Sequence, residues 1–391
     1  MLVHSVHRPN NRHNNQEETK DLIMKFSCER DELLAPLQTV NAVIERRQTM
    51  AVLSNVLAKV EGDELVLTGT DLELEVRTTV PISGDTDGTV TIPARKFSDI
   101  CRSLPEGARL DCRLEGQRLS LSSGRSKFVL SCLAADDFPT TDAVEDATSL
   151  EIPASVLRKG LARTHFAMAV ADVRFYLNGM LWELDAQGLR CVATDAHRLA
   201  RHDIAMELPN IGEKQQLIVP RKAIVELMRL LGEAGEDNVA MRFNARSLQI
   251  EVGQTRFTTK LLEGRYPDYE RVIPGQCEHW ITGDTAALKT SLQRVSILSN
   301  EKYRGVRLKL ANDTMVIQSH NPEHEEAEEE LSIDYVGEEL GIGFNVSYLL
   351  DALGAIDNEH YNLGLSGPDA SGVLKVPGQD ESVFVVMPMR L

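Results

Sequence analysis

The segment VATDAHRLA places Asp195 two residues before His197. On a strand, residues two apart point to the same face, so a carboxylate and an imidazole at this spacing can form an acid–base dyad. No serine or cysteine nucleophile is marked out by a motif beside them. A structural histidine held by hydrogen bonds is the simpler interpretation. An enzyme acting here remains the alternative, and it predicts a pH-dependent activity that His197→Ala abolishes.

Two further groups have side chains that bind metals. The run NPEHEEAEEE carries six glutamates, at positions 323, 325, 326, 328, 329 and 330, and the first 13 residues carry His4, His7 and His13. Consecutive glutamates are more typical of a solvated face or an ion-pairing edge than of a metal site. The three histidines lie in a stretch rich in asparagine and other polar residues. The sequence therefore predicts neither a metal site nor a cofactor.

Motifs for other chemistry are missing from the sequence. It contains no G-x-x-x-x-G-K-[ST] phosphate loop, no G-x-S-x-G nucleophile elbow and no H-E-x-x-H zinc motif. The six cysteines are scattered, without a C-x-x-C pair, as expected for reduced thiols in a cytoplasmic protein. No run approaches the roughly 18 apolar residues that would indicate a membrane-spanning helix. We therefore expect a cytoplasmic protein that is not an enzyme.

The elements that must position these residues form a repeat. A strand-like entry followed by an amphipathic helix recurs three times, in TIPARKFSDICRSL, LIVPRKAIVELMRLL and GIGFNVSYLLDALGAI. Pro93, Pro220 and Asn345 are equivalent in these copies, at spacings of 127 and 125 residues. The Thr-Asp pairs at 70–71 and 194–195 are 124 residues apart, and they end similar strands. A second amphipathic helix opens each copy, and alternating runs between the helices predict antiparallel strands.

The repeat predicts an α+β protein with three similar domains of about 125 residues, each with two helices and several strands. The limits we expect are 24–147, 150–273 and 276–391. Residues 1–23 are predicted to be a disordered extension, and Met24 is the expected true start of the protein. Mass spectrometry of the protein purified from its native source tests that expectation.

Charge is unevenly distributed along the chain, whose net charge is −17. The expected helices are residues 31–47, 95–104, 155–164, 221–231, 288–295 and 346–356. Together they hold 13 lysines and arginines and 6 acidic residues, a balance of +7, which leaves −24 for the remainder. Simple DNA binders are basic overall. Basic helices on an acidic body instead suit a protein that turns its helices towards a polyanion.

Several segments between Met24 and Leu391 carry a strong resemblance. They are TGTDLELEV, PARKFSDICRSLPEG, LEGQRLSLSSGRSKF, RFYLNGML, ATDAHRLA, GRYPDYERVIP, SNEKYRGVRL, NPEHEEAEE, FNVSYLLDAL and VFVVMPMRL. In this order they resemble the β sliding clamp family of bacterial DNA polymerase III. The resemblance implies a head-to-tail homodimeric ring of six domains, with helices lining the hole and sheets outside. It also implies a nucleoid-associated processivity factor that encircles double-stranded DNA without sequence specificity.

The family's working site is a groove between the second and third domains. It takes short linear motifs of the replicative polymerase, the clamp loader, and repair and translesion polymerases. Adaptable apolar side chains with a few polar groups suit such a groove. The resemblance places there Arg174, Leu177, Thr194, His197, Arg198, Leu199, Pro267, Arg271, Val272, Tyr303, Asn345, Tyr348, Val385, Val386, Met387, Pro388, Met389 and Arg390.

The resemblance also implies a ring interface and DNA-facing residues. The interface would join one edge of the first domain to the third domain of another chain, with basic side chains facing the glutamate run. Its expected residues are Lys96, Arg118, Arg125, Phe128, Leu130, Ile297, Leu298, Glu323, Glu325 and Glu326. Two departures from the family stand out: Val170 and Ala171 occupy positions that often carry DNA-contacting polar residues, and Ala196 replaces a common glycine. We therefore expect Arg47, Phe175 and Tyr176 to face DNA.

A third class of function, a sequence-specific DNA regulator, stays open but has less support. The chain carries no helix-turn-helix signal, and its acidic balance would go unexplained.

Overall fold

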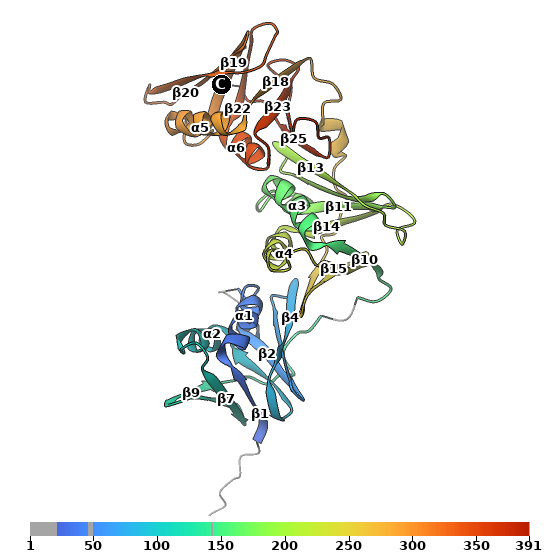
Figure 1. Ribbon diagram of the computed structural model, residues 1–391, viewed down its shortest axis with the longest axis vertical. Helices are drawn as coiled ribbons and strands as arrows, with labels where there is room; N and C mark the ends of the chain where they lie inside the picture. Colours follow the sequence, from blue (N-terminus) through green and yellow to red (C-terminus); the bar gives the residue numbers. More distant parts are fainter. Residues whose placement is uncertain (1–21, 46–49, 142–143, 391) are drawn as a thin grey trace, which may run out of the picture. The chain divides into compact units, whose positions relative to one another are not determined.

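The structure is a computed structural model that describes residues 22–45, 50–141 and 144–390. It combines α-helices with antiparallel sheets, as the α+β prediction requires (Figure 1). The chain divides into two compact units. Unit one runs to Gly69 and resumes over Thr78–Phe138, and unit two contains Thr70–Arg77 and Pro139–Leu391. The predicted extension 1–23 lies outside the described residues except for 22 and 23, which begin the first strand.

Unit one holds two helices that lie side by side, α1 (Arg30–Asn41) and α2 (Ala94–Ser103). Five of its strands form the sheet β5-β1-β7-β8-β9, and β2 pairs with both β3 and β6. The strand β4 (Leu74–Pro81) crosses the limit between the units. The remaining bounds are β1 (Leu22–Glu29), η1 (Ala51–Ser54), β2 (Asn55–Glu61), β3 (Glu64–Thr70), β5 (Ser83–Thr86), β6 (Gly88–Pro93), β7 (Arg109–Glu115), β8 (Arg118–Ser123) and β9 (Ser126–Ser131).

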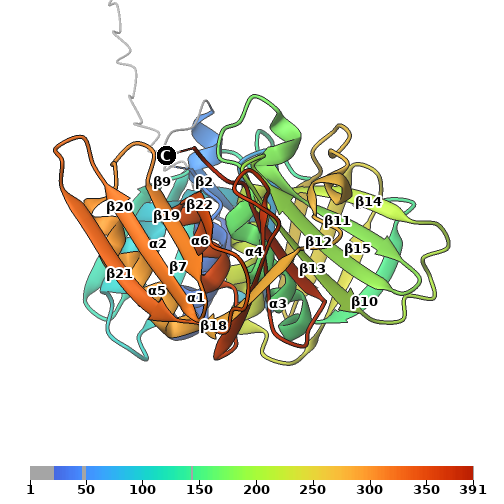
Figure 2. The same cartoon turned by 90° about the horizontal axis from the view of Figure 1, so that it is seen from above.

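Unit two holds four helices, α3 (Ala154–Thr164), α4 (Arg221–Glu233), α5 (Thr285–Val295) and α6 (Val346–Gly354), which pack as the pairs α3–α4 and α5–α6. Its strands β10-β15-β16-β17 are neighbours, and β14-β11-β12-β13-β25-β24-β23-β18 form one continuous sheet. The sheet β21-β20-β19-β22 packs against α5 (Figure 2).

The bounds of the other elements in unit two follow in chain order. They are β10 (Thr148–Pro153), η2 (His165–Ala167), η3 (Phe175–Asn178), β11 (Gly179–Asp185), β12 (Gly188–Thr194), β13 (Arg198–Ala205), β14 (Gln215–Pro220), β15 (Asn238–Phe243), β16 (Ser247–Val252), β17 (Thr255–Lys260), η4 (Tyr269–Val272), β18 (His279–Asp284), η5 (Ser296–Leu298), β19 (Gly305–Ala311), β20 (Thr314–His320), β21 (Glu326–Ser332), β22 (Leu340–Asn345), β23 (His360–Leu365), β24 (Gly372–Lys375) and β25 (Ser382–Val386).

The predicted strand-to-helix repeat is present in all three copies, as β6–α2, β14–α4 and β22–α6. Pro93 and Pro220 stand at the N-caps of α2 and α4, where a residue with a fixed φ and no N–H costs little. The third copy uses Asn345, whose Oδ1 accepts the N–H of Ser347 at 2.9 Å. Each cap ends a strand and starts a helix at the same position, which explains the regular spacing in the sequence.

The turns at residues 70–74 and 194–198 repeat the same hydrogen bonds. In each, the threonine Oγ1 accepts an N–H two residues on, at 3.1 Å, and donates to the carbonyl four residues on, at 2.9 and 2.7 Å. In each, the aspartate Oδ1 accepts the N–H groups two and three residues on. The residue after the aspartate has a positive φ, 83° at Leu72 and 72° at Ala196. Glycine adopts this conformation most easily, so the backbone at Ala196 is strained.

One expected element is wrong in extent. The helix predicted over residues 31–47 ends at Asn41. The next apolar residues, Val43 and Ile44, are β-branched and helix-disfavouring, and they are buried in the turn that follows. Val43 and Ile44 therefore continue the spacing of buried residues that is typical of a helix, although the helix has already ended. Arg47, expected to face DNA, lies outside the described residues.

Candidate functional site

The predicted partner-binding residues gather around the seam between β13 and β25. These strands pair antiparallel, with Arg198 opposite Val386 and His202 opposite Ser382. The seam joins the strands of residues 179–220 to those of residues 279–386 in one sheet. We call the surface formed by the predicted partner-binding residues around this seam the junction surface.

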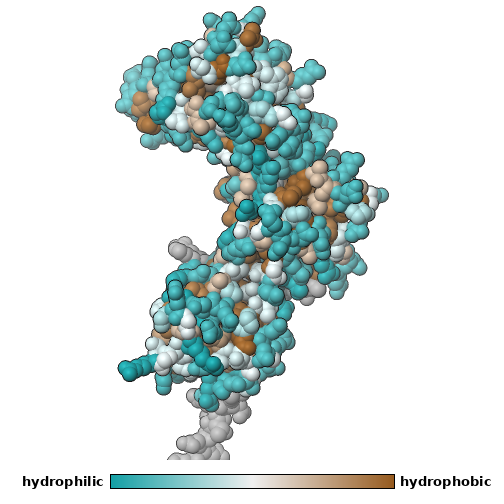
Figure 3. All heavy atoms as spheres, viewed as in Figure 1, coloured by the Kyte–Doolittle hydropathy of each residue, from teal (hydrophilic) through white to brown (hydrophobic). Residues whose placement is uncertain are grey.

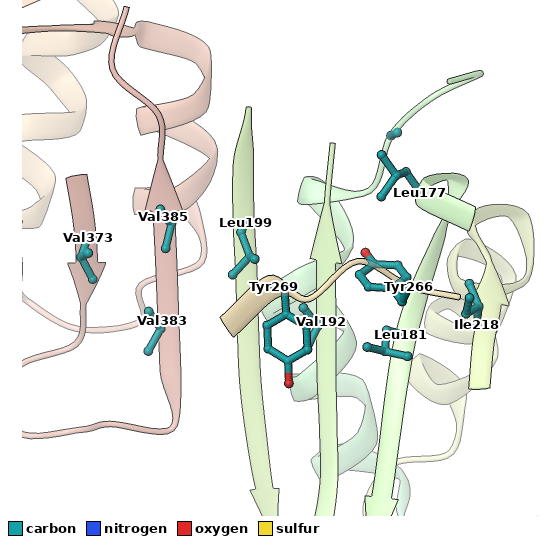
Figure 4. Packing of buried hydrophobic residues seen from close by; sticks show 11 residues of the cluster. Leu177, Leu181, Val192, Leu199, Ile218, Tyr266, Tyr269, Val373, Val383 and Val385 are labelled. Carbon is teal, nitrogen blue, oxygen red and sulfur yellow. The ribbon is translucent and has the colours of Figure 1, made fainter. Parts of the chain in front are cut away.

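A hydrophobic cluster underlies the junction surface (Figure 4). It brings together Leu199 of β13, Val385 of β25 and Leu177 of η3, each 2% exposed. Tyr266 and Tyr269 cross over the strands from the segment that follows β17, as Figure 4 shows. The other members are Ala169, Leu181, Val192, Ile218, Val373 and Val383. Burying these apolar side chains fixes the two sides of the seam against each other.

Both tyrosines are also fixed by hydrogen bonds. The Tyr266 hydroxyl accepts the N–H of Thr194 at 3.1 Å. The Tyr269 hydroxyl donates to the Glu183 carboxylate at 2.5 Å and accepts from Arg190 at 3.2 Å. Burial raises the pKa of both hydroxyls well above the ordinary value for tyrosine. These hydrogen bonds fix the segment that contains Pro267, Arg271 and Val272.

Arg198 is the central polar group of the junction surface. Its guanidinium lies over the Tyr348 ring at 4.6 Å and the Phe166 ring at 5.5 Å from the centroids. It forms ion pairs with Asp195, at 3.1 Å, and with Asp351 of α6. A planar guanidinium can stack on rings while its N–H groups bind carboxylates, which lysine cannot do as well. Arg198 therefore ties β13 to α6 across the seam.

Exposed side chains of the junction surface are partly apolar. Tyr303, Val272 and Met387 are 56%, 39% and 37% exposed. The His197 ring stacks on Tyr348 with centroids 6.2 Å apart, and the His197 carbonyl accepts the Met387 N–H at 2.9 Å. Apolar side chains held at fixed positions beside a few polar groups can bind a short peptide segment. Most other large apolar side chains are buried, and the surface is largely hydrophilic (Figure 3).

Three predicted arginines lie next to acidic side chains. Arg174 pairs with Asp172 at 3.0 Å, Arg271 with Asp268 at 2.6 Å and Arg390 with Asp369 at 3.7 Å. The hydrogen bonds from Arg174 lower the pKa of Asp172 to about 2. Of the remaining predicted residues, Asn345 donates to the Tyr303 carbonyl, Val386 is buried, Pro267 is exposed, and Pro388 and Met389 are half-buried.

Sequence reasoning missed four residues that build this surface: Asp351, Phe166, Tyr266 and Tyr269. Only Asp351 could have been found from the sequence, because Tyr348 and Asp351 lie three apart on one helix and so share a face.

Asp195 was considered as half of a catalytic dyad. Its Oδ1 instead accepts the main-chain N–H of His197, at 2.9 Å, and its Oδ2 accepts from Arg198.

The other predicted sites lie elsewhere on the chain. Phe175 is 52% exposed and meets Tyr176 edge to face at 5.9 Å. Ile297 is 75% exposed and Leu298 half-buried. Leu130 is only 6% exposed, so its side chain belongs to the core of unit one, and Val129, 52% exposed, is the apolar side chain that β9 presents. Phe128 is half-buried, and the charged interface residues are exposed: Lys96, Arg118, Arg125, Glu323, Glu325 and Glu326.

No group of three histidine, cysteine, aspartate or glutamate side chains is placed to hold a metal ion in the described part of the chain. No helix among residues 22–45, 50–141 and 144–390 is long and apolar enough to cross a membrane.

A buried histidine also lies on the seam. The Nδ1 atom of His202 is 2.8 Å from Ser382 Oγ, and the residue is 4% exposed. Burial, with a smaller contribution from Arg163 and Lys159, lowers its pKa to about 4, although Glu381 and Asp203 act in the opposite direction. The neutral imidazole is therefore the form that the folded seam favours.

This burial predicts an acid-sensitive seam. An unfolded histidine binds a proton below about pH 6.5, whereas folded His202 resists protonation down to about pH 4, so its contribution to stability is lost as the pH falls through that window. Between pH 7 and pH 5 we expect a loss of about 2 kcal/mol from this residue. Urea unfolding followed by tryptophan fluorescence should show a smaller loss in His202→Gln. An equal loss in both proteins would contradict the assignment.

Comparison with known proteins covers nearly the whole described chain. Models of the DNA polymerase III beta subunit match it in three parts: the N-terminal domain at residues 24–142, the central domain at 151–268 and the C-terminal domain at 270–390. The chain belongs to the beta sliding clamp family. As a member it is a sliding clamp of DNA polymerase III, a processivity factor, and the family name denotes no catalytic activity. The exact domain limits given from the sequence stay predictions.

Relatives in this family match nearly the whole chain. The chain is 48% identical to the beta sliding clamp of Pseudomonas putida and 43% identical to that of Escherichia coli, over 94% of this chain and 100% of each relative. A crystal structure of the DNA polymerase sliding clamp from Pseudomonas aeruginosa has 48% identity and a TM-score of 0.91, over 94% of this chain and 100% of that one. Caulobacter crescentus pol III beta has 34% identity and a TM-score of 0.89 over the same shares.

Proposed function

We propose that two copies of the chain close head to tail into a ring that encircles and slides on double-stranded DNA. The observation that carries this proposal is the opposite charge of two open sheet edges, one on each unit. The strand β9 ends one sheet of unit one, and β21 ends a sheet of unit two. Such edges pair readily with another chain. Strand β21 presents exposed Glu326, Glu328 and Glu330, whereas Arg125 and Lys127 are exposed at β9. Opposite charges on the two edges favour head-to-tail pairing over pairing of like edges.

A ring that retains DNA by enclosing it would explain why the helices are basic while the rest of the chain is acidic. The six helices in the described chain hold twelve lysines and arginines against six acidic residues. A ring that holds DNA by enclosing it needs no strong phosphate contacts, and strong contacts would slow sliding. The acidic remainder of the chain then limits nonspecific adhesion to DNA.

The junction surface is the proposed tether for partners. We assign it to short linear motifs of the replicative polymerase, the clamp loader and repair polymerases. Support comes from the exposed apolar side chains of Met387, Val272 and Tyr303 beside the fixed His197 and Arg198. Peptide recognition of this kind needs anchors in fixed positions, because ordering them on binding would reduce affinity.

The test of the ring combines mass and topology. Light scattering should give a mass near twice that of the 43.4 kDa chain. Protein placed on nicked circular DNA by the clamp loader should remain bound through gel filtration, and cutting the circle once should release it. Equal retention on circular and linear DNA would overturn the enclosing ring, as would a monomer at micromolar concentration.

A further inference from the structure

A cationic hollow lies on unit two beside the junction surface. Its floor is Gly341 and Gly343 of β22, and its volume is about 490 Å³. On the neighbouring strand β19, Lys309 pairs with Gly341 and Arg307 with Gly343. Residues directly opposite in a ladder point to the same face, so both long cationic side chains rise beside a floor that has no side chains. The rest of the lining is Pro368, Asp369, Met389 and Arg390.

The lining of the hollow is positively charged, whereas the chain as a whole is negatively charged. Arg307, Lys309 and Arg390 line it, and Asp369 supplies the one carboxylate among its lining residues. The Arg390–Asp369 pair is 3.7 Å apart, with the two side chains 94% and 76% exposed. An ion pair this exposed and this long contributes little to holding the two side chains. Even with the Asp369 carboxylate counted, the lining has three positive charges and one negative charge. A local excess of positive charge on a chain of net charge −17 attracts anionic groups.

Glycine keeps the floor open. A Cβ atom built on Gly341 would meet no heavy atom within 4 Å, and the φ of Gly341 lies outside the range that strains other residues. A Cβ atom would therefore fit there, and a longer side chain would extend into the hollow. Glycine in a strand interior often marks a place where another backbone or a ligand approaches closely.

The C-terminal tail connects the hollow to the junction surface. The Met387 N–H donates to His197 on one side at 2.9 Å, and the Met389 N–H donates to Gly343 on the other at 2.8 Å. The tail residues 387–390 thus form a wall shared by the two surfaces. A peptide docked beside Met387 needs only a few further extended residues, at about 3.3 Å each, to reach the hollow.

We propose that the hollow binds the carboxylate side chains of acidic residues that flank the docked segment of a partner peptide. This inference rests on the proposed peptide-binding function of the junction surface. The side chains of Lys309 and Arg390 provide charge-assisted hydrogen-bond donors, and the open glycine floor admits the peptide backbone. The hollow would discriminate among partners that share the same apolar anchors but differ in flanking charge.

The test measures fluorescence anisotropy with a labelled peptide from the C-terminal tail of the replicative polymerase. Four derivatives carry Glu-Glu or Gln-Gln at either end. With the full-length chain at physiological salt, Glu-Glu at one end should tighten binding about three- to tenfold over Gln-Gln, as expected for exposed ion pairs. Most of the gain should be lost in Lys309→Gln, and all of it in Gly341→Glu.

The control is Lys260→Gln, which removes one charge from another exposed strand lysine of unit two. It should retain the gain, and the unextended peptide should bind all variants alike. If Glu-Glu gives no gain, or if the gain survives both hollow variants, the inference is wrong while peptide binding stands. If the unextended peptide fails to bind the unmodified chain, peptide binding itself is wrong.

Discussion

Deleting Met387–Leu391 should abolish binding of the polymerase-tail peptide while leaving the ring closed. The deletion removes Met387, which offers exposed apolar surface, and the main-chain hydrogen bonds from the tail to His197 and Gly343. It leaves β25 (Ser382–Val386) intact, so the seam with β13 and the cluster beneath it remain. We expect affinity to fall at least 100-fold in fluorescence anisotropy, since an anchor in the centre of a binding surface carries much of its energy.

A matched variant distinguishes the effect of removing the side chains of residues 387–391 from the effect of removing their main chain. Replacing residues 387–391 by Gly-Ser residues keeps the length and most main-chain groups, and it should bind almost as poorly as the deletion. Sedimentation should show the same dimer mass for both variants and the unmodified chain. Peptide affinity unchanged in the deletion variant would remove the tail from the site.

Replacing Ile297 and Leu298 together by alanine should convert the dimer into a monomer. Ile297 is 75% exposed in the single chain, so its aliphatic side chain is available to another chain. If the ring interface buries both residues, truncating a buried isoleucine or leucine to alanine costs about 2–5 kcal/mol each. The proposed ring would contain two such interfaces, so changing the one chain sequence would weaken both.

The control for this variant is Val336→Ala. Val336 is 88% exposed on the same unit and is not among the expected interface residues, so its truncation should leave the dimer unchanged. Sedimentation velocity at micromolar concentration measures both variants. The Ile297/Leu298 variant should also escape from nicked circular DNA. A persistent dimer would show that these side chains lie outside the interface.

Local pattern predicted the elements well and their tertiary partners poorly. The strand-to-helix copies were visible because Pro93, Pro220 and Asn345 each cap a helix directly after a strand. The extra turn predicted for α1 failed because Val43 and Ile44 are buried without a helix. A helical spacing of apolar residues reports burial, and burial alone does not decide the backbone.

In the candidate site, too, the individual residues could be predicted but their contacts with distant residues could not. Resemblance assigned Arg198 and Tyr348 separately, but nothing in the sequence joined them to Phe166. The hydrogen bond from Tyr269 to Glu183 spans 86 residues, and the Arg198–Asp351 pair spans 153. Such pairings depend on which strands become neighbours. The inward turn of Leu130 depends on strand register, because a shift of one residue exchanges the two faces of a strand.

One continuous sheet passes through the β13–β25 seam and connects the two sides of unit two. Bending at the seam would require several contacts to break together: the five residue pairs between the strands, the contact of buried His202 with Ser382, and the Arg198–Asp351 ion pair. We therefore expect the seam to resist bending, so that the residues of the junction surface keep their positions relative to one another. The proposed docking region would then present the same geometry to each partner.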